Sequence, residues 1–340
     1  MNKKTVFYLL GSTLLFAIVF AIALMVGQFQ ISVSDFFKTV FTNNQSVNIQ
    51  RSIIVNLRLP RTIMAACTGI ALSVSGLLFQ DVFQNKLTSP DLLGVSTGAS
   101  VGAAIAILLG LSSAFISMFA FVFGIVTVLL TVFIAKIFKG GNTITLILAG
   151  IIVGGLMSSI LSFIKFLSDP TTTLTTITYW LMGSFENATM SQVWIILPVV
   201  VIVSFVLILL AWRINIVALG KEEAQTRGIN YKAYSALLIG FATLLTALTV
   251  AFNGVVSWVG LVIPHLVRVI VGRDARRSIP LSIVFGGTFM IVADIISRSF
   301  TLQEIPLSAV TGLIGTIVFV VIVVIKGGIN NVNKRWKFIF

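Results

Sequence analysis

The sequence has little charge and very few of the residues that build metal or disulfide sites. Charged residues make up 10% of the 340 positions, whereas hydrophobic residues make up 57%. A soluble domain of this size needs a more polar surface, so the composition indicates a polytopic membrane protein. The one cysteine, Cys67, excludes a disulfide framework, and the one histidine, His265, excludes a histidine cluster. We therefore expect no metal to be bound by this chain.

The sequence also lacks the motifs of an enzyme. It contains no G-x-x-x-x-G-K-[ST] loop, no paired carboxylates, no Ser/His/Asp set and no H-E-x-x-H helix. We therefore expect no catalysis, no cofactor held by this chain and no ATP hydrolysis by it alone. Few ionisable groups fall inside apolar runs (Lys165, His265, Arg268 and Asp294), which disfavours coupling to an ion gradient. Asp294 and Arg298 stand at i and i+4 and can pair, either as a tether or as a relay.

Long apolar runs dominate what is present. Because about 20 apolar residues cross the hydrocarbon core, runs bounded by charge, Gly or Pro predict ten transmembrane helices and an all-α fold. The first run is longer than the apolar part of a signal peptide, so we expect a retained anchor. A weak echo, L-x-x-P-x-L at 87–92 and 261–266, hints at two related halves. The predicted spans are 5–27, 61–80, 93–110, 114–135, 143–164, 191–212, 233–252, 255–271, 279–297 and 307–325.

The positions of Lys and Arg predict the orientation in the membrane. With the N-terminus inside, the inner segments hold 17 of these residues and the outer segments hold 6. This asymmetry places both termini in the cytoplasm. The net charge of +13 is distributed over the ends of apolar runs rather than gathered in one patch, so we expect the lipid bilayer as a partner and no nucleic acid.

One polar interruption, 215–232, stands out between two charge-free runs. Good helix formers over 218–227 are followed by Gly228, where the residue after a helix commonly needs a positive φ. The pattern predicts a short helix on the cytoplasmic face that a soluble partner can push. An ordinary solvated loop is the alternative interpretation.

Several ordered motifs run along nearly the whole chain: Arg58-Leu-Pro-Arg61, Gly69-x6-Gly76-Leu-Leu-Phe-Gln80, Asn85 to Ala99, Leu219 to Asn230, Trp258 to Arg268 and Glu304-Ile-Pro306. Together they resemble the motifs of the permease family that imports iron-siderophores, haem and cobalamin, the membrane subunits of type II ATP-binding-cassette importers. The resemblance implies a single permease domain, 1–340.

The resemblance implies roles for three sets of residues. A cytoplasmic ATPase subunit would contact Gly220, Lys221, Glu222, Glu223, Arg227 and Gly228. An external substrate-binding protein would meet Arg58, Arg61 and Arg298, although arginines at span ends also snorkel to lipid headgroups. A cytoplasmic gate would include Asn85, Leu87 and Thr143, although Asn and Thr also cap helices. Lys86 departs from the family pattern, which usually has proline there.

The family also implies ten spans, a second permease copy or paralogue, and a short external helix after the fifth span that begins near Asp169. We therefore predict a multi-pass permease of a bacterial cell membrane that imports an iron chelate or a related haem- or cobalamin-type cargo. Two alternatives are an ion-coupled secondary transporter and a membrane sensor or scaffold.

Overall fold

The computed structural model describes residues 3–27, 29, 31–32, 36, 48–138, 143–300 and 303–337. Helix is the regular secondary structure found in these residues, and eight helices are long and apolar enough to cross a membrane. Two shorter apolar helices, α5 and α12, bring the set to the ten spans predicted. The ten are α1 (Lys3–Met25), α4 (Leu59–Val82), α5 (Val95–Leu108), α6 (Ser113–Ile137), α7 (Thr143–Leu167), α9 (Met190–Val217), α11 (Tyr231–Asn253), α12 (Val259–Val271), α13 (Ala275–Ser299) and α14 (Leu307–Lys337).

The breaks between spans fall where the sequence predicted them, but several span ends differ: α9 continues to Val217 and α14 to Lys337, past the predicted 212 and 325. Gly110 and Gly254 have φ of +66° and +70°, which separates α5 from α6 and α11 from α12. The second span begins earlier than predicted, because α3 (Asn48–Ser52) and the π-helical η2 (Ile53–Arg58) lead directly into α4. The two prolines of the L-x-x-P-x-L echo occupy different positions: one begins η3 (Pro90–Leu93), whereas the other lies inside α12.

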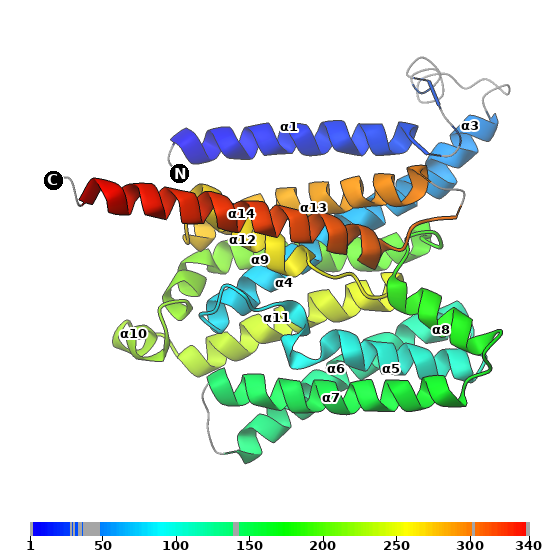
Figure 1. Ribbon diagram of the computed structural model, residues 1–340, viewed down its shortest axis with the longest axis horizontal. Helices are drawn as coiled ribbons and strands as arrows, with labels where there is room; N and C mark the ends of the chain where they lie inside the picture. Colours follow the sequence, from blue (N-terminus) through cyan, green and yellow to red (C-terminus); the bar gives the residue numbers. More distant parts are fainter. Residues whose placement is uncertain are drawn as a thin grey trace.

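Helix α4 forms the centre of the bundle, with nearly every residue buried. It is surrounded by α9, α11, α12 and α13 (Figure 1). Small residues allow this close packing: a side chain on Gly69 would collide with the backbone of Gly286, and one on Gly76 would collide with that of Gly260. Since apolar side chains gain little by leaving lipid for one another, such close backbone approach is a main source of helix association in membranes.

Polar side chains join α4 to its neighbours inside this apolar core. The Ser73 hydroxyl donates to the Ser282 carbonyl oxygen at 2.7 Å, and the Ser75 hydroxyl donates to the Ala242 carbonyl oxygen at 2.9 Å. The Asn253 amide donates to the Thr68 hydroxyl at 2.9 Å. These bonds fix the rotation of α4 relative to α11 and α13, because each needs one particular face of the helix.

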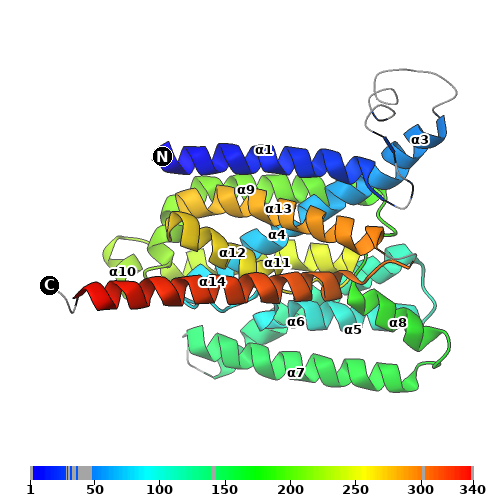
Figure 2. The ribbon, with the colours of Figure 1, turned by 45° about the horizontal axis from the view of Figure 1, so that its top comes forward.

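The start of α1, the end of α14 and the short helix α10 (Lys221–Thr226) lie at the same end of the bundle (Figures 1 and 2). The short helix α8 (Thr173–Met182) and α3 lie at the opposite end. Most residues of α1 are exposed, and most of the exposed ones are apolar, as expected for a helix that faces lipid. An even number of spans returns the chain to the side on which it began, so ten spans agree with both termini lying at one end of the bundle. Which end faces the cytoplasm stays a prediction.

Candidate functional site

Helix α10 is short because a glycine interrupts the chain just before it. The sequence predicted a helix over 218–227, but Ala218 ends α9, and Gly220 with φ +108° begins a separate helix at Lys221. Gly228 follows α10 with φ +73°, as the sequence predicted. Two glycines in conformations that other residues rarely adopt therefore define both ends of α10.

One face of α10 is buried and the other is open. Ala224 is fully buried against Ile216 of α9 and Ile229. Glu222, Glu223 and Arg227 are exposed, and Glu223 pairs with Arg227 at 3.9 Å along the same helix. The small apolar face seats α10 on its own subunit, while its charged face remains available to a partner.

The segment that carries α10 contacts the end of α4 at two points. The Tyr231 hydroxyl donates to the carbonyl oxygen of Val82 at 3.3 Å, and the Gln84 amide donates to that of Ala218 at 3.4 Å. Gln84 itself adopts φ +51°, which is uncommon for a residue other than glycine. Sequence reasoning missed Gln84 and Tyr231, because neither has a local motif and both contacts span more than 130 residues.

The residues predicted to form a gate follow directly on this contact. Asn85 and Leu87 lie in the turn after α4, where the Asn85 side-chain oxygen accepts from the Leu87 amide at 3.0 Å. That bond closes a local turn between α4 and η3, and no helix begins directly after Asn85, so Asn85 does not cap a helix here. Thr143 begins α7, a helix that packs against η3, the segment to which the turn after α4 leads. The gate role of the three residues stays a prediction.

The three arginines predicted to meet an external protein are not at the surface. Arg58, Arg61 and Arg298 are only 5%, 8% and 5% exposed. Arg61 pairs with Asp294 at 2.7 Å and with Glu304, and Arg298 pairs with Asp294 at 3.3 Å. The expectation that these side chains face outward, or snorkel to headgroups, is therefore wrong for this structure.

These contacts form what we call the arginine network, which ties α1, α4, α13 and the segment before α14 together. Arg298 donates to the carbonyl oxygen of Ala23 at 2.5 Å, and Arg58 donates to those of Leu24 and Met25 at 3.0 and 2.7 Å. The pairing of Asp294 with Arg298 that the sequence suggested is confirmed at 3.3 Å. The choice between a tether and a relay stays a prediction. Docking through these arginines remains a prediction from the resemblance, and their burial gives it no support.

A second buried cluster joins α4 to α12. Arg268 donates to the Asp81 carboxylate at 2.8 Å, to the Gln80 side-chain oxygen at 2.8 Å and to the Leu77 carbonyl oxygen at 3.1 Å. Charge-assisted bonds of this kind fix a guanidinium in one orientation. Sequence reasoning noted Arg268 as ionisable but could not identify its partners.

The predicted external helix is present as α8, and Asp169 organises its start. The hydroxyl and backbone N–H groups of Thr171 and Thr172 all donate to one oxygen of Asp169. These hydrogen bonds lower the pKa of Asp169 to about 2. Several of the threonines that follow are exposed, so this end of the bundle offers a hydroxyl-rich surface.

Known proteins resemble this chain over nearly its full length. It is 34% identical over 327 residues, 95% of this chain and 97% of the relative, to the molybdate import system permease protein MolB of Haemophilus influenzae. It is 32% identical over 285 residues, 82% of this chain and 85% of the relative, to the Fe(3+) dicitrate transport system permease protein FecC of Escherichia coli.

A solved structure described as an inward-facing conformation of a metal-chelate type ABC transporter superposes with a TM-score of 0.84. It is 34% identical, over 93% of this chain and 98% of that chain. Residues 14–325 match the FecCD transport family. The chain therefore belongs to the FecCD transport family, and it is a permease subunit of the ABC importer type.

Proposed function

We propose that this chain moves a ferric chelate across a bacterial cell membrane, driven by a separate cytoplasmic ATPase that pushes on α10. The observation that carries the proposal is the seating of α10. Its buried face holds it to α9, its charged face is open, and the flanking segment contacts the end of α4. A rigid-body push on such an element is transmitted to the bundle, whereas a loosely held loop would absorb it.

The contacts suggest where the push goes. Gln84 and Tyr231 join the α10 segment to the end of α4, and Asn85 and Leu87 follow immediately. A movement of α10 would therefore reach the turn predicted to form the inner gate before it reaches most of the bundle. Lys86, in the same turn, adds a charge where the family usually has proline, so the gate here differs in chemistry from that pattern.

The proposed assembly has further parts. Two ATPase subunits would bind at the α10 end, a substrate-binding protein would deliver cargo at the α8 end, and a second permease copy or paralogue would complete the pathway. Exposed hydroxyls around α8 suit a surface past which a large chelate slides without binding tightly. The ferric cargo is supported by the similarity to the permease named for Fe(3+) dicitrate.

A second cargo has its own support. The similarity to the molybdate import permease extends over 97% of that relative, so molybdate is the alternative to a ferric chelate. A comparison of the uptake of the two cargoes tests the cargo assignment directly. Proteoliposomes that hold the permease, its ATPase and its binding protein would be supplied with a radiolabelled ferric siderophore or with radiolabelled molybdate. ATP-dependent uptake of the ferric siderophore alone is expected, and uptake of molybdate alone would overturn the cargo assignment.

The same vesicles distinguish the transport mechanism from its alternatives. Uptake should require ATP and survive collapse of ion gradients by ionophores. Uptake that follows an ion gradient without ATPase subunits would identify a secondary carrier. Failure of the complete complex to move either cargo would favour a sensor or scaffold.

A further inference from the structure

Helix α7 lies at the edge of the bundle and is attached to it by few elements (Figure 1). Its main contacts are with α5, α6 and the short helix η3, and among the described residues it has no comparable contact with the central helix α4. Much of its remaining surface is exposed and apolar. Of these three elements, η3 is the first to follow α4 in the chain. The position of α7 relative to α4 therefore depends on how η3 is held.

Each of the four residues of η3 contacts a different helix. Pro90 packs on α12, where a Cβ added to Gly260 would lie 2.6 Å from the Pro90 Cδ. Leu92 packs on α7, where a Cβ added to Gly150 would lie 2.2 Å from the Leu92 carbonyl oxygen. Glycine is therefore needed at both positions, since a side chain would push η3 away.

Polar bonds hold the other two residues of η3. The Ser96 hydroxyl of α5 donates to the Asp91 carboxylate, and the Thr131 hydroxyl of α6 donates to the Leu93 carbonyl oxygen at 3.1 Å. Gly94 then ends η3 with φ +81°, and its N–H donates to the Asp91 carbonyl oxygen at 2.9 Å. Four helices thus hold one short segment, which leaves η3 little freedom to deform.

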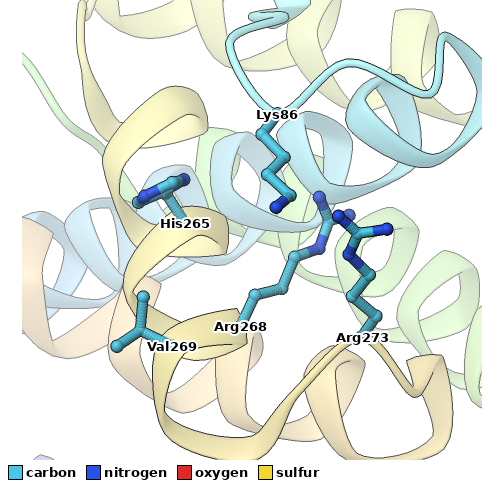
Figure 3. Close-up of a pocket in the computed structure, with 5 residues that line it drawn as sticks. All are labelled: Lys86, His265, Arg268, Val269 and Arg273. Carbon is cyan, nitrogen blue, oxygen red and sulfur yellow. The ribbon is translucent and has the colours of Figure 1, made fainter. Parts of the chain in front are cut away.

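The turn that leads from α4 into η3 is the one that the α10 segment contacts. Its Gln84 amide donates to the Ala218 carbonyl oxygen at 3.4 Å. Figure 3 shows the same turn beside α12, with the Lys86 side chain extending toward Arg268. Close-packed protein interiors compress little and transmit displacement. A movement of this turn therefore reaches η3 and, through the Leu92 carbonyl oxygen, α7.

We propose that η3 is a rigid link that transmits movement from the α10 end of α4 to α7, and that Gly150 is the residue that positions α7 against this link. The inference rests on the proposed function, because it takes α10 as the origin of the movement. It adds one element to that function. Since α7 begins at Thr143, the predicted gate residues on both sides of η3 would move together.

The test compares Gly150→Ala with Gly155→Ala, a matched control on the same helix, where an added Cβ meets nothing within 4 Å. A single environment-sensitive fluorophore on Ile144→Cys, a position that is 70% exposed, reports on the start of α7, and Cys67→Ala removes the one native thiol. The permease would be reconstituted with its ATPase, and the ATP-dependent shift in emission would be measured. We expect Gly150→Ala to lose the shift, because α7 no longer follows η3, and Gly155→Ala to keep it.

The failure of this inference can be told apart from the failure of the proposed function. A full shift in folded Gly150→Ala would overturn the link and leave the proposed function standing. This holds even if the melting temperature falls, since Gly150 would then have a structural role only. Absence of an ATP-dependent shift in the permease that keeps Gly150 would overturn both.

Thr131→Val decides the question if Gly150→Ala does not fold. It keeps the branched shape of the side chain but removes the hydroxyl that donates to the Leu93 carbonyl oxygen, so it loosens η3 without adding volume. It should reduce the ATP-dependent shift. Its control is Thr316→Val, at an exposed threonine bonded within its own helix, which should keep the full shift. Equal shifts in the two threonine variants would overturn the inference.

Discussion

Replacing Asp294 by asparagine removes the charge at the centre of the arginine network. Asp294 is fully buried and pairs with both Arg61 and Arg298. Asparagine keeps an oxygen that can accept from Arg61, and Arg61 also retains Glu304. Arg298 would keep only its bond to the Ala23 carbonyl oxygen among the described contacts. Removing one partner of a buried ion pair costs about 3–5 kcal/mol. Because Arg61 keeps some of its contacts, we expect Asp294→Asn to lower the free energy of unfolding by about 3 kcal/mol, the low end of that range.

The assay is thermal unfolding of the purified permease in detergent. A loss of this size corresponds to a fall in melting temperature of roughly 5–10 °C for a large domain. The control is Asp274→Asn: that carboxylate is half-exposed, its distance to Arg277 is 3.7 Å, and asparagine also caps helices. Exposed ion pairs contribute about 0–1 kcal/mol, so Asp274→Asn should change the melting temperature little. Equal shifts in the two variants would refute the interpretation of the network as a buried tether.

Three further predictions follow from local geometry. The hydrogen bonds that lower the pKa of Asp169 from 3.8 to about 2 contribute stability that is present above pH 3.8 and lost as the pH falls through about 2. An acid titration of tryptophan fluorescence should show this loss, and Asp169→Asn should lack it. Gly220→Ala forces alanine to φ +108°, so it should lower the free energy of unfolding by about 1–2 kcal/mol and slow cargo uptake. The control Gly240→Ala adds a methyl group in open space and should change neither stability nor uptake in this way. Gly76→Ala should lower the melting temperature by an amount equivalent to about 1–3 kcal/mol, because its methyl group would collide with Gly260; an unchanged melting temperature would contradict that packing.

The spans and the short helix could be predicted from the sequence because both depend on neighbouring residues. A run of about 20 apolar residues must cross the hydrocarbon core as a helix, whatever it packs against. Gly228 ends a helix because of its own backbone freedom, and the structure gives it φ +73°. Even here the start of α10 was misplaced, since Gly220 was interpreted as part of a continuous helix.

The burial of Arg58 and Arg61 could not be predicted in the same way. Residues 58 and 61 fall at the end of an apolar run, where arginine commonly faces water or headgroups. Arg61 is buried against Asp294 and Glu304, which are more than 230 positions away in the chain. Arg58 is buried against the carbonyl oxygens of Leu24 and Met25, which lie 34 and 33 positions away. The links of Gln84 and Tyr231 to distant carbonyl oxygens were missed for the same reason. Such pairings follow from helix packing, which local patterns do not encode.

The central claim is that an ATPase drives this permease through the seated helix α10. The most direct test compares Ala224→Asp, which places a charge on the buried face of α10, with Gln225→Asp, which makes the same change at an exposed position. Both would be reconstituted with the ATPase and the binding protein, and cargo uptake per ATP hydrolysed would be measured. The account predicts that Ala224→Asp loses uptake and cargo-stimulated ATP turnover while the complex still assembles, and that Gln225→Asp retains both. Equal uptake per ATP in the two variants would contradict it.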